Sequence, residues 1–211
     1  MRDIIRPYYG KLVYVHRLVH IDNVPHILAN GLVHPNSKNA DPSYVPIGDQ
    51  AIISIRKELH NGYTLSDYIP FYFGPRGPML YVIHKGLNDV HPYPQEELVY
   101  ILIKIETVIE QGWECIFTDG HAITAITSYY RKDDLSRVNE LVKAEDVYAK
   151  YWKDDDDLDL TRRKQAELLI KDEIPFIFIA GFFVYNENAR DKLIKMGVNH
   201  NRIIVEPRYY F

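Results

Sequence analysis

The chain is organised around residues 161–171, which read Thr161-Arg162-Arg163-Lys164-Gln165-Ala166-Glu167-Leu168-Leu169-Ile170-Lys171. One acid, Glu167, follows the basic triplet and begins an apolar run that predicts a strand over residues 167–170. A carboxylate at the mouth of a core strand, held partly dry, can stabilise a developing cation or position a hydroxyl group. The alternative is a surface glutamate paired with Arg162 or Arg163, and this segment taken alone favours that alternative.

Length and composition limit the fold to one domain. The 211 residues, 46% hydrophobic and 26% charged, suffice for one packed core and are short for two. The net charge of −4 gives no overall basic field, so contact with nucleic acid would have to come from a local basic patch. We therefore expect a single domain over residues 1–211.

Cysteine, histidine and hydropathy patterns exclude several classes of protein. The one cysteine, Cys115, excludes an intrachain disulfide and a cysteine-rich zinc site, and is typical of a buried residue in a reducing compartment. The histidines show no spacing with carboxylates that predicts a metal site. No apolar run reaches the length of a membrane span and no cleavable leader is visible, so we expect a cytoplasmic protein.

Hydrophobic periodicity predicts a mixture of strands and helices. A helix is expected to begin at Asp22 or Asn23 and to end at Gly31, and another to begin at Ala122. Strands are expected at residues 12–20, 79–84, 99–105, 114–117 and 167–170. The proline-rich segment 33–47 is typical of a long loop, and loops of that length in a compact domain are often functional. The class is therefore α+β or α/β.

The most specific signal is an aromatic and proline-rich block, Asp67-Tyr68-Ile69-Pro70-Phe71-Tyr72-Phe73-Gly74-Pro75-Arg76-Gly77-Pro78-Met79-Leu80-Tyr81. Neighbours on a strand point to opposite faces, so Phe71, Tyr72 and Phe73 cannot all be buried. At least one of them is expected to face a groove, where it can stack on a flat ligand, and Arg76 is expected on a turn. The alternative is a rigid loop with hydrophobic anchors.

Three shorter patterns are further candidates. His20 and Asn23 lie where a strand passes into a helix, where an imidazole, an amide and backbone donors can form a ribose pocket. Arg56 follows the proline-rich loop, and His121 follows a strand and an Asp-Gly turn. Each also has a plainer interpretation, respectively a helix cap, a surface cation and a turn residue.

These motifs, in this order, resemble the DarT-type DNA ADP-ribosyltransferase toxins. The resemblance runs from about Val13 to Phe211, and the aromatic block and the Gln165-Ala166-Glu167 segment are its most specific parts. It implies an α+β fold: a single ADP-ribosyltransferase-like domain with a split mixed β-sheet around an NAD cleft. It also implies a bacterial toxin that transfers ADP-ribose from NAD, used as a co-substrate without a metal, to a base in single-stranded DNA. A macrodomain antitoxin would reverse or neutralise the toxin, and we expect the protein to be a monomer.

The resemblance also implies roles for individual residues. Glu167 resembles the family's catalytic glutamate, and Arg56 falls near its catalytic arginine, with a role in electrostatic stabilisation of an anionic base. By position, the NAD-binding residues would be His20, Asn23, Tyr72 and Arg76. We expect Arg162 and Arg163 to hold DNA phosphates and His121 to lie at the substrate DNA. His121 stands where the family pattern suggests an amide residue, which leaves the base open between thymine, the favoured one, and guanine.

Two rival functions remain at this point. One is an ADP-ribosyltransferase that acts on RNA or protein, which nothing in the residues excludes. The other is a nucleotide or nucleic-acid binding module without turnover, and the presence of both Glu167 and Arg56 argues against it.

Overall fold

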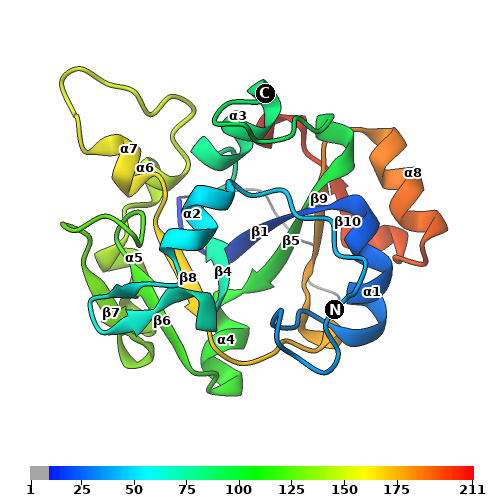
Figure 1. Cartoon of the computed structure of the whole chain (residues 1–211), viewed down its shortest axis with the longest axis horizontal. Coiled ribbons are helices and arrows are strands. Elements are labelled where there is room, and N and C mark those ends of the chain that lie inside the picture. Colours follow the sequence, from blue (N-terminus) through cyan, green and yellow to red (C-terminus); the bar gives the residue numbers. More distant parts are fainter. Residues whose placement is uncertain (1–9) are drawn as a thin grey trace.

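Eight strands pair into one mixed sheet in the computed structural model of the chain, which describes residues 10–211 (Figure 1). In chain order they are β1 (Tyr14–His20), β4 (Ile69–Tyr72), β5 (Leu98–Lys104), β6 (Cys115–Thr118), β7 (Tyr129–Arg131), β8 (Glu167–Ile170), β9 (Gly181–Val184) and β10 (Ile203–Val205). Across the sheet the order is β10-β9-β5-β1-β4-β8-β6-β7, and all neighbours are antiparallel except β9 and β10. The first nine residues of the expected domain lie outside the described part.

Short helices surround this sheet, and a small hairpin of β2 (Leu59–His60) and β3 (Tyr63–Thr64) stands apart from it. The α-helices are α1 (Val24–Asn30), α2 (Gln50–Ile55), α3 (Pro78–Lys85), α4 (Ile105–Gln111), α5 (Val138–Leu141), α6 (Ala144–Val147), α7 (Leu160–Arg163) and α8 (Glu187–Lys195). The 3-10 turns are η1 (Ile21–Asn23), η2 (Leu65–Asp67), η3 (Gln95–Glu97), η4 (Lys132–Arg137), η5 (Phe176–Phe178), η6 (His200–Arg202) and η7 (Pro207–Tyr209). The helix expected after Asp22 and the loop expected at 33–47 are both present.

The sheet consists of two halves joined by a narrow seam. β1 pairs with β5 along its whole length, from Tyr14–Lys104 to His20–Leu98, whereas β1 and β4 share the single pair His16–Tyr72. His16 is buried at this seam, and burial lowers its pKa to about 3, so the ring is neutral. This arrangement confirms the expected α+β fold with a split mixed sheet.

Both faces of the central strands are covered. Val15 and Val19 of β1 belong to a large cluster on one face, while Leu18 and the neighbouring Tyr100 of β5 belong to a second cluster on the other. Side chains alternate along a strand, so a strand buried on both faces must be apolar at successive positions, as residues 98–103 are. The core therefore packs against both faces of β1 and β5, and polar side chains such as His20 and Lys104 lie at the strand ends.

The prediction of a strand at residues 79–84 is wrong, because these residues form α3. A short apolar run does not by itself distinguish a strand from a buried helix. Here Pro78 provides a first-turn residue, Leu80 and Ile83 bury one helical face, and Gly86 ends the helix in a left-handed conformation with φ of 60°.

The helix predicted to begin at Ala122 is also absent, and residues 119–128 form a series of turns. Side-chain hydrogen bonds replace the helical ones. The Asp119 carboxylate accepts from Ser128 N at 2.9 Å, and the Thr127 hydroxyl donates to His121 O at 2.8 Å. Such side-chain bonds to the backbone compete with helix formation, and they close the segment, which we call the 119–128 loop, on itself.

Gly74 lies in close contact with α6, next to a buried lysine. A Cβ atom at Gly74 would overlap Val147 O, and the Lys164 ammonium donates to that same oxygen at 2.5 Å and to Pro75 O at 2.9 Å. Burial lowers the pKa of Lys164 to about 7. The oxygen cannot move away from a new methyl group without breaking the lysine's hydrogen bond.

We predict that Gly74→Ala lowers the free energy of unfolding by about 1–3 kcal/mol, the usual cost of overpacking. Urea denaturation with a fitted midpoint and slope would measure it. Gly77→Ala is the matched control, because its Cβ would meet nothing within 4 Å and its φ is −86°. Equal stability of Gly74→Ala and Gly77→Ala would contradict the prediction.

Candidate active site

Glu167 is the first residue of β8 and is fully buried. It stands opposite Tyr72 in the sheet register, and its backbone N donates to the Thr118 hydroxyl at 3.1 Å. Its carboxylate pairs with neither Arg162 nor Arg163. The surface glutamate considered from the sequence is therefore not what the structure contains.

The partner of Glu167 is Arg56, which caps the C-terminal end of α2. Arg56 Nη1 lies 2.9 Å from Glu167 Oε2 and donates to Oε1 at 3.3 Å, and Oε1 also accepts from Ala122 N at 3.0 Å. Burial alone would lower the pKa of Arg56, but the charge and hydrogen bond of Glu167, with Tyr72 and Tyr129, together outweigh burial and the pKa is raised. Side-chain exposures of 12% and 1% make this a nearly dry ion pair.

Two polar atoms of this pair are left without hydrogen-bond partners among the described residues. They are Arg56 Nη2 and Glu167 Oε2, and both are buried. An unsatisfied buried donor or acceptor costs about 1–3 kcal/mol, so such atoms are rarely retained without a use. Arg56 Nη2 has donor capacity, and Glu167 Oε2, although ion-paired, has acceptor capacity, for the polar groups of a ligand.

The pair forms one wall of a cavity of about 340 Å³. Other walls come from β1, α2, β4 and α3, which include Arg17, Tyr72 and Met79. The segments between elements add Tyr44, His121 and Gln165. A second cavity of about 210 Å³ lies under the 33–47 loop, and its lining includes Asn23, His26, Leu32 and His34. Arg17 and Tyr44 line both cavities. The two cavities are therefore neighbours that share one cation and one aromatic ring.

Burial and the charge of Glu167 shift the pKa of three groups in or near the first cavity, Tyr72, Tyr129 and His121. Burial raises the pKa of Tyr72, and the charge of Glu167 adds to the effect. Burial and Glu167 likewise raise the pKa of Tyr129, near the cavity, to about 12. Burial lowers the pKa of His121, against the influence of Glu167. The His121 ring can therefore accept a hydrogen bond or a proton at pH 7.

Two of the residues expected at an NAD site, Tyr72 and Asn23, each line one of the two cavities. Tyr72 lines the first cavity between the buried Phe71 and Phe73, which agrees with the expectation that one aromatic residue of the block faces a groove. Asn23 lines the second cavity, and its amide holds the 33–47 loop by donating to Val45 O at 2.9 Å and accepting from Val45 N at 2.8 Å.

His20 and Arg76 line neither cavity. The His20 ring lies 3.4 Å from the Glu97 carboxylate and packs edge-on against Tyr93. Arg76 adopts a φ of 55°, donates to Tyr210 O at 2.6 Å and lies over the Phe211 ring. Arg76 is therefore on a turn, as expected, but the turn anchors the C-terminal residues.

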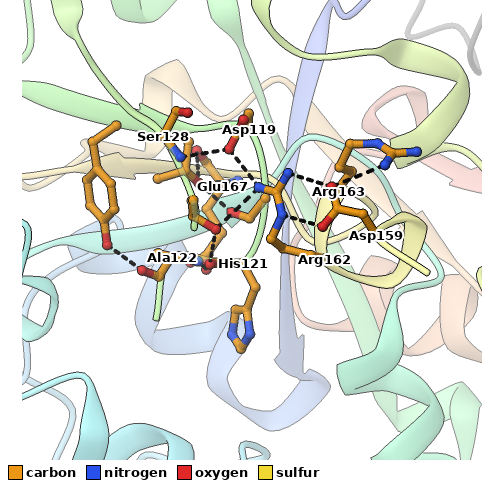
Figure 2. Close-up of polar contacts among 12 residues, drawn as sticks. Asp119, His121, Ala122, Ser128, Asp159, Arg162, Arg163 and Glu167 are labelled. Atoms are coloured by element: carbon orange, nitrogen blue, oxygen red, sulfur yellow. Dashed lines mark hydrogen bonds and ion pairs between the residues drawn. The ribbon is translucent and has the colours of Figure 1, made fainter. Parts of the chain in front are cut away.

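Arg162 and Arg163, the expected phosphate contacts, are engaged by carboxylates. Arg162 contacts Asp119 and Asp159 at 2.8 and 2.7 Å (Figure 2). Arg163 contacts Asp146, Asp157 and Asp159 at 2.5–3.1 Å. Their side chains are 12% and 21% exposed. Contact with a DNA phosphate would have to compete with these ion pairs.

Arg17 and Tyr44 line the first cavity and were not singled out from the sequence. Arg17 carried a usable signal, because it is a charged residue inside an otherwise apolar strand. Tyr44 carried none, since a loop tyrosine is an ordinary surface residue. Gln165 lines the cavity as well, and the sequence pointed to it only as part of the Gln165-Ala166-Glu167 segment.

Within residues 10–211, no group of three or more His, Cys, Asp or Glu side chains is arranged to hold a metal ion. The helices of that same part of the chain are all too short or too polar to cross a membrane.

Comparison with known proteins identifies the family. The family model for DarT, described as an ssDNA thymidine ADP-ribosyltransferase, matches residues 16–211. A DNA ADP-ribosyl transferase of Escherichia coli O127:H6 is 35% identical over 183 residues, which cover 84% of this chain and 82% of that protein. One from Thermus sp. (strain 2.9) is 29% identical over 187 residues, or 86% of each chain.

Solved structures agree with this match. The structure of Thermus sp. 2.9 DarT in complex with ADP-ribosylated ssDNA has a TM-score of 0.82 and 26% identity, and the match covers 98% of this chain and 100% of that one. The complex of the same protein with NAD+ has a TM-score of 0.76, with 97% and 100% covered. The chain therefore belongs to the DarT family and is an NAD-dependent DNA ADP-ribosyltransferase.

Proposed function

We propose that the base modified by this enzyme is thymine in single-stranded DNA and that transfer takes place in the cavity bounded by Arg56 and Glu167. The observation that carries this proposal is the buried ion pair in which Arg56 Nη2 and Glu167 Oε2 have no hydrogen-bond partner among the described residues. A family model for thymidine transferases supports the choice of base.

NAD would occupy both cavities. The nicotinamide and its ribose fit the first cavity, where Tyr72 provides an aromatic wall and Glu167 a hydroxyl partner. The adenosine half fits the second, beneath the loop that Asn23 holds. The pyrophosphate between the two halves would then pass Arg17, whose Nη1 donates to Pro70 O at 3.0 Å and which forms no ion pair with a carboxylate in residues 10–211.

Glu167 would act on the sugar. When the bond between the ribose carbon and the nicotinamide nitrogen breaks, its electron pair neutralises the nicotinamide and leaves positive charge on the ribose. A fixed carboxylate stabilises that charge and orients the ribose hydroxyls. Glu167 is suited to this because Arg56, Ala122 N and Thr118 hold it from three sides.

Arg56 and His121 would act on the acceptor base. A thymine nitrogen becomes nucleophilic as it loses its proton, and the guanidinium of Arg56 stabilises the resulting anion. His121 is neutral, faces the same cavity and can accept a hydrogen bond or the proton. A base can reach this cavity only when it is unstacked, which favours single-stranded DNA over a duplex.

The biological setting is proposed from the relatives. A Thermosipho africanus protein of which this chain matches half, at 27% identity, is a fusion of a DNA ADP-ribosyl transferase with a DNA ADP-ribosyl glycohydrolase. An enzyme that removes the mark is the natural partner of one that adds it. We therefore propose that this chain is the toxin of a pair, acts as a monomer in the bacterial cytoplasm and is opposed by a macrodomain antitoxin.

The first prediction concerns Glu167. We expect Glu167→Gln to lower the rate of DNA modification by on the order of 10²–10³, because the amide keeps the shape but not the charge. Mass spectrometry of a thymidine-containing oligonucleotide would measure the rate. Glu110→Gln, on the exposed end of α4, is the control. A folded Glu167→Gln enzyme with near wild-type rate would overturn the assignment.

The second prediction concerns Arg56. Removing its charge altogether would leave Glu167 unpaired in the core, at a cost of about 3–5 kcal/mol, so Arg56→Lys is the better variant. A lysine keeps the charge but lacks the planar fork. We expect loss of DNA modification with NAD binding retained and slow NAD hydrolysis still present. Full DNA modification by Arg56→Lys would show that a point charge is enough.

The third prediction tests the placement of NAD. We expect Arg17→Met to weaken ADP-ribose binding by roughly 10- to 150-fold, the value of one hydrogen bond to a charged group. Calorimetry would measure it. Nicotinamide has no phosphate, so its affinity should not change and serves as the internal control. Unchanged ADP-ribose binding would place the pyrophosphate elsewhere.

A further inference from the structure

We infer that Arg162 is a positioning residue for the transfer reaction: it clamps the 119–128 loop so that Ala122 N keeps its hydrogen bond to Glu167. This inference rests on the proposed role of Glu167. It assigns Arg162 a function inside the protein in place of the phosphate contact expected from the basic triplet.

The first observation is that Arg162 holds the loop at three points. Its backbone O accepts from His121 N at 3.0 Å, and its Nη1 donates to Asp119 Oδ1 at 2.8 Å and contacts the Thr127 hydroxyl at 3.3 Å. Figure 2 shows the guanidinium between the loop on one side and Asp159 on the other. The Asp119 oxygen that Arg162 holds also accepts from Ser128 N, so both ends of the loop meet at this cation.

The second observation is that the other edge of the guanidinium is fixed. Arg162 Nε donates to Asp159 Oδ1 at 2.7 Å and Nη2 to Asp159 Oδ2 at 2.8 Å, a bidentate pair of the kind that fixes orientation. The hydrogen bond from Arg162 is the main reason that the pKa of Asp159 is lowered. The clamp therefore ties the loop to α7, the helix from which the chain passes directly into Glu167.

The third observation is that the loop supplies a backbone donor to the Glu167 carboxylate. Ala122 N donates to Glu167 Oε1 at 3.0 Å, and the Thr118 hydroxyl, which accepts from Glu167 N, donates to Gly120 O at 2.7 Å. Within the loop, backbone turn bonds run from Thr124 N to His121 O at 3.0 Å and from Thr127 N to Thr124 O at 2.9 Å. A shift of the loop would thus move a donor that fixes the Glu167 carboxylate, together with the His121 ring beside it.

The fourth observation is the fit between Gly120 and Arg162. A Cβ atom at Gly120 would overlap Arg162 Nη1 and would lie 2.8 Å from its Cγ and 3.0 Å from its Cζ. The whole arginine side chain would have to move to accept a methyl group. Gly120→Ala is therefore a way to disturb the clamp from the opposite side without changing any charge.

The main experiment compares Arg162→Met with wild type in three measurements. We expect kcat for oligonucleotide modification to fall by up to about 10²-fold, the loss that a displacement of about 1 Å can cause. The dissociation constant of ADP-ribose should not change. The salt dependence of single-stranded DNA binding should keep its slope, whereas loss of a phosphate contact would reduce the slope by about 0.7.

Two controls separate the clamp from general effects. Arg137→Met removes an exposed cation that, within residues 10–211, forms an ion pair with Glu140 alone, and it corrects the salt slope for the lost charge. Arg163→Met removes a neighbouring cation of α7 whose partners, Asp146, Asp157 and Asp159, lie outside the loop. We expect a smaller fall in kcat for Arg163→Met than for Arg162→Met. Equal falls would mean that α7 matters as a whole and would overturn the clamp.

Gly120→Ala alone, in which Arg162 is still present, keeps the inference testable if the Arg162 variants are unstable. Gly120→Ala should lower kcat by itself and have no further effect in an Arg162→Ala background, because the Cγ, Cζ and Nη1 atoms that would meet the new Cβ are then absent. Additive effects, a wild-type kcat for Arg162→Met, or a reduced DNA salt slope would each reject the clamp. Activity of Glu167→Gln would instead reject the proposed function itself, so the two failures can be told apart.

Discussion

The structure depends on one buried ion pair between residues 111 positions apart in the chain, Arg56 and Glu167. Two charges with almost no exposure are costly unless each satisfies the other, and breaking such a pair is more costly still. Their attraction holds the end of α2 against the start of β8. Because α2 follows directly from the proline-rich loop, the same contact helps to place Tyr44 and the other loop residues that close the cavity.

The sequence predicted the mixed α+β framework, and the roles of the site residues stay a prediction. Glu167 and Arg56 were selected through the family resemblance, because the segment around Glu167 taken alone favoured a surface glutamate and Arg56 also fitted a surface cation; the structure places the two side chains together at one cavity. The nature of α3 was not predictable from a six-residue apolar run, since its period fits both a strand and a helix. The turns of the 119–128 loop depend on side-chain partners, which local propensity does not describe.

The same dependence on side-chain partners distant in the sequence explains why the position of the basic triplet was not predictable. Arg162 and Arg163 are adjacent cations in the sequence and suggest an exposed strip, yet Asp119 and Asp146 reach them from positions 43 and 17 residues away. Lys164 completes the triplet and is buried on backbone oxygens. A run of like charges shows its function only when the fold reveals which opposite charges it meets. Asn23 is a similar case, because its amide is used to hold Val45 and shapes the cavity through the loop.

The seam between β1 and β4 has a mechanical consequence. The two halves of the sheet share the one residue pair His16–Tyr72, whereas β1 and β5 are paired along their full length. Few backbone hydrogen bonds join the halves there, so side-chain packing holds them together: the larger core cluster includes Val15 of β1 as well as Phe71 of β4 and Leu168 of β8. The first cavity spans the seam, with Arg17 on one side and Tyr72 and Glu167 on the other. The part of the sheet that is held by the least backbone pairing is therefore the part that the first cavity crosses.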